Sequence, residues 1–121
     1  MNNDLFSIDQ INHEDGVIAA ILGINSGSDI LEGHFPGHPV VPGACMLQVV
    51  KDTLERTLIQ SLRLRKADQL KFMNMIDPAS TSIVRLDVVY RYDEEGDICV
   101  IAKLSNPEVI YFKFQGSFIK T

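Results

Sequence analysis

The sequence predicts an α+β fold in which an antiparallel sheet curls around one long helix. A long segment that begins near Gly43 has helical periodicity and is apolar on almost every side in its first half, which indicates that other elements surround it. Three segments towards the C-terminus alternate apolar and polar residues with a period of two, as half-buried strands do. A sheet that covers one apolar helix satisfies both patterns.

The helix is expected to begin at 43–44, directly after Pro42, because proline favours the first turn of a helix. Its period predicts an end near Leu62, since Leu54, Leu58 and Leu62 would then share one face.

The strands are predicted from apolar alternation bounded by turn residues. In chain order the expected strands are 5–11 (or a short helix), 17–24, 70–76, 82–92, 97–104 and 110–118, with turns at 13–16, 93–96 and 105–108 and a loop at 25–29.

Length and composition predict one globular domain, residues 1–121. Hydrophobic residues make up 45% of the chain and the net charge is -5, which argues against a general nucleic-acid binder. The sequence contains no secretory signal or membrane-spanning run, so we expect a soluble, cytoplasmic protein without membrane partners.

Cys45 and Cys99 lie far apart in the sequence and are expected to be small apolar residues of the interior. The three histidines have no ligand pattern around them, so no metal site is predicted.

The segment 33–43, Gly-His-Phe-Pro-Gly-His-Pro-Val-Val-Pro-Gly, contains the residues that suggest chemistry. Three prolines stiffen the surroundings of His34, and an imidazole takes up and releases a proton near neutral pH. A structural proline bend with an incidental histidine explains the residue types equally well.

Gly43, the last residue of this segment, and Gln48 add to the candidate site. Gly43 places free backbone N–H groups at the helix N-terminus, where they can polarise a carbonyl, although it can equally just start the helix. Gln48 is polar within the most apolar part of the helix, so it either satisfies a nearby backbone group or points into a polar site.

The run from Gly33 to Gln48 resembles the motif of the β-hydroxyacyl-acyl carrier protein dehydratases, which have the hot-dog fold. That family pattern is H-F-P-x-x-P-x-x-P-G, four variable residues and an acidic residue. The matching positions are His34, Phe35, Pro36, Gly37, Pro39, Pro42 and Gly43. The resemblance implies a hydro-lyase of fatty-acid or polyketide-type synthesis, which converts a 3-hydroxyacyl thioester to a trans-2-enoyl thioester without a cofactor.

The resemblance also implies residue roles. His34 would remove a proton from the α-carbon, and the Gly43 N–H would polarise the thioester carbonyl. Further substrate contacts are expected from Phe35, Pro36, Gly37, Pro42 and Ala44. The family has an acidic residue fourteen positions after the histidine, where this chain has Gln48.

This departure leaves three outcomes open. In the first, His34 performs both proton transfers while Gln48 holds the hydroxyl or a water. In the second, another group, such as His38, substitutes for the acid. In the third, the protein binds an acyl thioester with reduced or absent turnover. The alternatives to a dehydratase are a hot-dog thioesterase and a non-catalytic acyl-binding partner subunit.

The expected partners also follow from the resemblance. They are a substrate carried by acyl carrier protein or coenzyme A, and a second subunit in a homodimer or higher homo-oligomer. Carrier proteins are acidic, and one cationic cluster is available to dock them: Arg63, Arg65, Lys66 and Lys71. These charges would also offset the helix dipole if they lie at the helix C-terminus. Met46, Met73 and Met75 are candidates to line an acyl tunnel, or to pack in the core.

Overall fold

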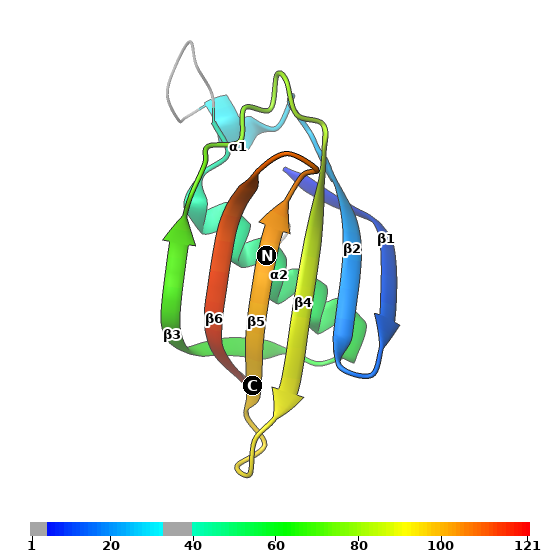
Figure 1. The fold of residues 1–121 in the computed structure, drawn as a ribbon, viewed down its shortest axis with the longest axis vertical. Coiled ribbons are helices and arrows are strands. Elements are labelled where there is room, and N and C mark those ends of the chain that lie inside the picture. The colour runs from blue at the N-terminus through cyan, green and yellow to red at the C-terminus, as the bar shows by residue number, and fades with distance from the viewer. Residues whose placement is uncertain (1–4, 33–39) are drawn as a thin grey trace.

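The computed structural model describes residues 5–32 and 40–121. Within them, one antiparallel sheet with the strand order β1-β2-β4-β5-β6-β3 curves around α2 (Figure 1). The strands are β1 (Phe6–Glu14), β2 (Val17–Ile24), β3 (Leu62–Phe72), β4 (Ile83–Tyr92), β5 (Ile98–Ser105) and β6 (Ile110–Lys120), and the helices are α1 (Asp29–Glu32) and α2 (Gly43–Leu58). The predicted arrangement, an antiparallel sheet around a central helix, is confirmed.

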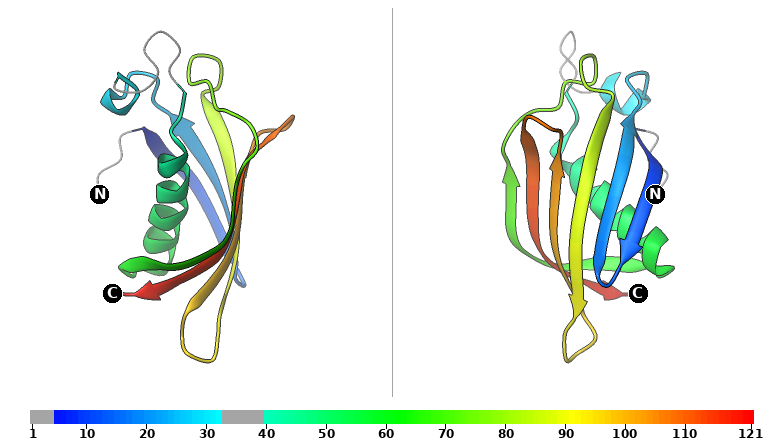
Figure 2. Two further views of the ribbon diagram at one scale, coloured as in Figure 1. Left: turned by 90° about the vertical axis from the view of Figure 1, so that its left-hand side faces the viewer. Right: turned by 45° about the vertical axis from the view of Figure 1, so that its right-hand side comes forward.

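Seen from the side, α2 lies in the hollow of the curved sheet (Figure 2). The alternation in β4, β5 and β6 directs one set of apolar side chains towards α2, and these side chains are buried together with the apolar face of the helix. The largest of them include Phe112, Phe114, Phe118, Leu86 and Leu104. Full burial of each such side chain stabilises the fold by about 1.5–3 kcal/mol. The sheet therefore has an inner face that packs on α2 and an outer face that does not.

The predicted start of α2 is confirmed, but its predicted end is wrong. The helix ends at Leu58, Ile59 adopts a left-handed conformation with φ 54°, and Leu62 begins β3. The Glu55 side chain accepts a hydrogen bond from the Leu62 N–H at 2.8 Å. Leu62 is buried, as its helical period suggested, yet it reaches the core from a strand that pairs with Lys120 of β6.

The strand predicted over 70–76 is also displaced, because β3 spans Leu62–Phe72. Among the described residues, this strand forms the edge of the sheet and pairs with β6 alone. Most of its side chains are exposed, so its sequence lacks the apolar alternation that identified the other strands.

The N-terminal segment is a strand, not a short helix, and turns into β2 at Asp15 and Gly16, which both have positive φ. The expected loop at 25–29 runs into the short helix α1 at Asp29.

No helix among the described residues is long and apolar enough to cross a membrane.

Candidate active site

A pocket of about 700 Å³ lies where α2 begins. It is mainly apolar, and its walls come from the segment before α2, the first turn of the helix, the end of β3 and the residues after β3. The lining residues are Val40, Val41, Pro42, Gly43, Met46, Phe72, Met73, Asn74 and Met75. All three methionines that the sequence suggested as tunnel candidates therefore line one pocket.

Backbone hydrogen bonds hold the two walls of this pocket in place. The Val41 N–H donates to the Ile76 carbonyl at 3.0 Å, which ties the segment before α2 to the chain after β3. The Met73 N–H donates to the Tyr111 carbonyl at 2.8 Å, which continues the attachment to β6 beyond the end of β3. The pocket is thus built into the frame of the sheet.

Gly43 on one wall of the pocket lies close to Phe72 on the other. A Cβ atom at this position would lie 2.7 Å from Cε1 of the Phe72 ring, closer than real Cβ contacts come. The Phe72 ring is itself stacked on Phe112 of the core, with ring centroids 5.0 Å apart. A side chain at position 43 would therefore force the Phe72 ring to move where α2 meets the pocket.

The first turn of α2 directs backbone donors towards this region. Pro42 precedes the helix in an extended conformation, and the Cys45 N–H donates to its carbonyl at 3.0 Å. The N–H groups of Gly43 and Ala44 come before this first bond, so the helix itself offers them no acceptor. Pro42 and Gly43 line the pocket, whereas Ala44 is exposed and is not among the lining residues.

Gln48 lies one turn further along α2 and is half-buried. Its Nε2 donates to Oδ1 of Asp52 at 2.8 Å. A carboxylate can only accept hydrogen bonds, so the carbonyl oxygen of the Gln48 amide is directed away from Asp52. Asp52 is not among the site residues predicted from the sequence, although its spacing of four residues from Gln48 on a helix is the signal that could have identified it.

His34, Phe35, Pro36 and Gly37 lie outside the described residues, as does His38. Their predicted roles stay predictions. The sequence also did not place Phe72 and Asn74 in the pocket, because they follow an edge strand with little apolar alternation and reach the helix only through the fold.

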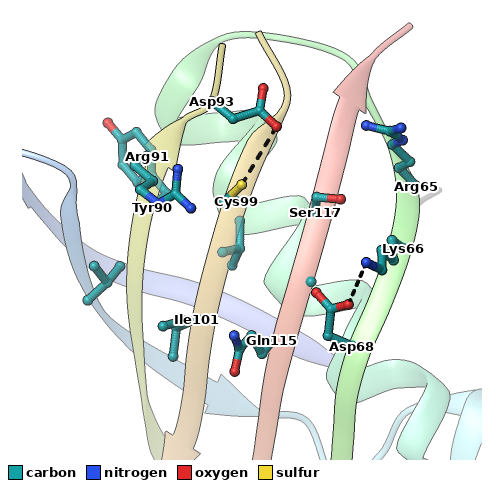
Figure 3. A pocket seen from close by; sticks show the side chains of 13 residues that line it. Arg65, Lys66, Asp68, Tyr90, Arg91, Asp93, Cys99, Ile101, Gln115 and Ser117 are labelled. Carbon is teal, nitrogen blue, oxygen red and sulfur yellow. Dashed lines mark hydrogen bonds and ion pairs between the residues drawn. The ribbon is translucent and has the colours of Figure 1, made fainter. Parts of the chain in front are cut away.

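The four residues predicted to dock a carrier lie on β3 and not at the helix C-terminus. Arg65 pairs with Asp97 and lies 3.6 Å from Glu95, and Lys66 pairs with Asp68 at 3.0 Å. Arg65 and Lys66 line a second pocket, of about 370 Å³, on the outer face of the sheet (Figure 3). Arg65 and Lys66 of the predicted cluster therefore already have acidic partners within the chain.

The two cysteines are unpaired thiols. Burial raises the pKa of the Cys45 thiol above that of an ordinary cysteine, so this side chain is protonated at neutral pH. The described part of the chain contains no group of three histidine, cysteine or acidic side chains that could hold a metal ion.

Solved structures with the same arrangement define the fold class. The chain superposes with a TM-score of 0.68 and 16% identity on a chain of the dehydratase heterocomplex ApeI:P from Xenorhabdus doucetiae, covering 93% of this chain and 96% of that one. It also superposes on the thioesterase SAV0944 from Staphylococcus aureus, with a TM-score of 0.64, 12% identity and coverage of 96% and 93%. At such low identities these likenesses establish the fold alone, which is the hot-dog fold.

The sequence comparison identifies the family. Residues 10–105 match the ApeI-like family, described as ApeI dehydratase, so the chain belongs to the ApeI-like dehydratases. A curated relative is the 3-hydroxyacyl-(acyl-carrier-protein) dehydratase FabZ of Wolbachia pipientis wMel, which is 27% identical over 81 residues, 59% of this chain and 54% of the relative. The match spans about half the length of the first curated relatives.

Proposed function

We propose that this chain removes water from a 3-hydroxyacyl thioester to give a trans-2-enoyl thioester, in the cytoplasm and as a step of fatty-acid or polyketide-type synthesis. Membership of the dehydratase family supports the reaction class. The apolar pocket supports an acyl substrate, because its lining is dominated by methionine, valine and phenylalanine side chains that suit a hydrocarbon chain.

The position of Gly43 is the observation that carries the proposal. This glycine forms a wall of the pocket and also supplies a backbone N–H at the start of α2. A thioester carbonyl bound there gains negative charge when the α-carbon loses a proton, and helix N-terminal N–H groups stabilise such charge. The absence of a side chain lets the carbonyl approach the backbone.

The proton transfers are assigned to His34. Its imidazole takes the proton from the α-carbon, and the electron pair of that C–H bond forms the new double bond. The bond between the β-carbon and the hydroxyl oxygen then breaks. The proton held on the imidazole passes to the departing oxygen, so water leaves and the histidine returns to its neutral form.

Gln48 takes the place of the acidic residue in this proposal. Asp52 holds the amide nitrogen, so the amide carbonyl oxygen is left to accept a hydrogen bond from the substrate hydroxyl or from a water. This interaction positions the leaving group without donating a proton. A group that positions but does not protonate is consistent with assigning both transfers to one imidazole.

A homodimer is part of the proposal. β3 is an edge strand of 11 residues that pairs with no strand of the described part of the chain on its outer side. Exposed apolar side chains follow it at Met73 and Met75. A second copy placed against this edge would cover both the backbone groups and the pocket.

The decisive experiment measures the hydration of a crotonyl thioester, the reverse reaction, with the wild type, His34→Ala and Gln48→Glu. We expect His34→Ala to lower the rate by about 10²- to 10⁴-fold, the range of a lost general acid-base group. Gln48→Glu should preserve or raise the rate, because it supplies a carboxylic acid at the same place.

Equal hydration rates in the wild type and His34→Ala would contradict the catalytic assignment. Faster thioester hydrolysis than enoyl hydration would favour a thioesterase. A second candidate, a subunit that acts within a heterocomplex, is suggested by the superposition on the ApeI:P complex. Co-purification with another hot-dog chain, together with activity only in the complex, would support that candidate.

A further inference from the structure

Three lysines lie side by side on the outer face of the sheet. Lys113 of β6 is in register with Lys103 of β5 on one side and with Lys71 of β3 on the other. The next residues along, Phe72 and Phe112, stack against each other on the inner face, which places Lys71 and Lys113 on the outer face. Neighbouring strands are about 4.8 Å apart, so the three side chains share a strip roughly 10 Å wide.

In this lysine row (Lys71, Lys103 and Lys113), like charges face each other across two strand pairs, and Asp87 faces Lys103 from β4. Like charges directly opposite one another on neighbouring strands destabilise a sheet. Among the described residues, no carboxylate forms an ion pair with any of the three, and Asp87, the next residue across from Lys103, pairs with Arg85 at 2.9 Å. An external anion would relieve this repulsion.

The surroundings of the lysine row favour a protein as the anionic partner. Val89 and Ile101 stand beside it and are 52% and 56% exposed, although both are large apolar side chains. They line a hollow of about 410 Å³ whose charged lining residues are Lys103, Lys113 and Asp87. Figure 3 shows Ile101 and Gln115 on this outer face, next to the pair formed by Lys66 and Asp68. Cationic and apolar groups in one strip suit an acidic surface that also carries apolar side chains.

The lysine row also lies close to the candidate active site. Lys71 immediately precedes Phe72, whose ring lines the pocket and meets Gly43. The end of β3, the end of β5 and the start of β6 lie at the end of the sheet where α2 begins (Figure 1). The lysine row is therefore one residue along β3 from the pocket lining, on the opposite face of the sheet.

We infer that the lysine row, with Val89 and Ile101, docks the acidic carrier protein that delivers the acyl substrate. This inference rests on the proposed function, since it names the source of the thioester. It replaces the cluster predicted from sequence, because Arg65 and Lys66 are neutralised within the chain while Lys71 joins two lysines that are distant in sequence.

The test compares two double variants with the same loss of charge. Lys103→Gln with Lys113→Gln removes the centre of the row, and Arg56→Gln with Lys120→Gln is the control far from it. Binding to a fluorescently labelled bacterial acyl carrier protein is measured by polarisation at low and high salt. We expect the first variant to bind about tenfold more weakly and to lose most of its salt dependence, with the control within twofold of the wild type.

Kinetics separate the docking surface from the active site. The first variant should have a raised KM for the crotonyl carrier protein and an unchanged rate with crotonyl-N-acetylcysteamine, an uncharged small thioester. Equal carrier binding by the two double variants would overturn the inference, as would binding of the wild type to anionic lipid vesicles but not to the carrier. If neither thioester reacts, the proposed function fails, while the polarisation measurement still decides the docking surface.

Discussion

At the scale of single residues, Gly43 and Phe72 lie close together on the two walls of the pocket. The two residues are far apart in sequence and lie close together where the helix start approaches the end of β3. The prediction that a glycine belongs at the helix start came from the motif, but the steric reason for it appears only in the structure.

Gly43→Ala should therefore reduce activity strongly with a smaller effect on folding. The new Cβ forces the Phe72 ring to move, which narrows the pocket and displaces the backbone N–H; we expect about a tenfold or greater loss in kcat/KM and about 1–2 kcal/mol lower free energy of unfolding. Steady-state kinetics and urea unfolding measure the two effects.

Gly27→Ala is the matched control for Gly43→Ala, since its added Cβ would meet only the Asn25 side chain, at 3.4 Å. Adding Phe72→Leu to Gly43→Ala should restore part of the lost activity by relieving the clash. An active Gly43→Ala enzyme with normal kinetics would show that the close contact is unimportant.

The pair Gln48 and Asp52 gives a second prediction at this scale. Asp52→Ala should lower kcat about three- to tenfold, because the Gln48 amide loses the partner that orients it. Asp52→Asn should retain most of the activity, since its side-chain carbonyl still accepts the Gln48 N–H.

The readout for this pair is a double-mutant cycle. In a Gln48→Ala background, Asp52→Ala should have no further effect on kcat if Asp52 acts only by positioning Gln48. Additive losses would mean that Asp52 acts independently.

Cys45 provides a pH-dependent prediction. Its raised pKa means that the folded state holds the thiol proton more tightly than the unfolded state does. Titration of the Cys45 thiol therefore leaves the free energy of unfolding unchanged at neutral pH. It lowers that free energy as the pH rises above the ordinary cysteine pKa. In a Cys99→Ala background, the folded protein should react with a thiol reagent more slowly at neutral pH than the unfolded protein does. Equal rates would contradict a protonated, shielded thiol.

At the scale of elements, the end of α2 illustrates how local periodicity can mislead. Leu54, Leu58 and Leu62 follow a helical period, but the backbone leaves the helix at Ile59 and Leu62 reaches the core from β3. The pattern correctly indicated that Leu62 is buried but not in which element it lies, because both a helix and a strand can direct it inward.

Ile59→Gly should stabilise the protein. Ile59 has φ 54° and is 89% exposed, so a β-branched residue occupies a left-handed position without packing against anything. Glycine removes the steric strain, and we expect the free energy of unfolding to rise by about 1 kcal/mol. Urea denaturation measures this change, and Ile59→Ala, which keeps a Cβ at positive φ, should gain less. A glycine variant no more stable than the wild type would contradict this account of the helix end.

At the scale of the whole molecule, the free edge of β3 and the exposed pocket residues predict self-association. Light scattering should give a mass near 27 kDa, twice the 13.5 kDa of one chain. Leu70→Glu should shift the protein towards the monomer, because Leu70 lies on the edge strand and is 42% exposed in the single chain. Val17→Glu also replaces an exposed apolar side chain by glutamate, but on the outer face of β2, and should leave the mass unchanged. A wild-type mass of one chain would contradict the dimer.

The sequence alone determined the elements whose signal is local. The alternation of apolar residues in the C-terminal strands, the Val17–Ile24 strand and the start of α2 after Pro42 all depend on neighbours within a few residues, so they could be predicted correctly. The motif that begins at His34 likewise needed only the order of residues along the chain.

Only the tertiary structure decided what depends on register and strand order. It placed β3 at the sheet edge, brought Phe72 to Gly43, aligned Lys71, Lys113 and Lys103, and paired Arg65 with Asp97. Such contacts join segments far apart in the chain. Local sequence carries no information on which strands become neighbours or on the register between them. Both are decided by the packing of the whole core.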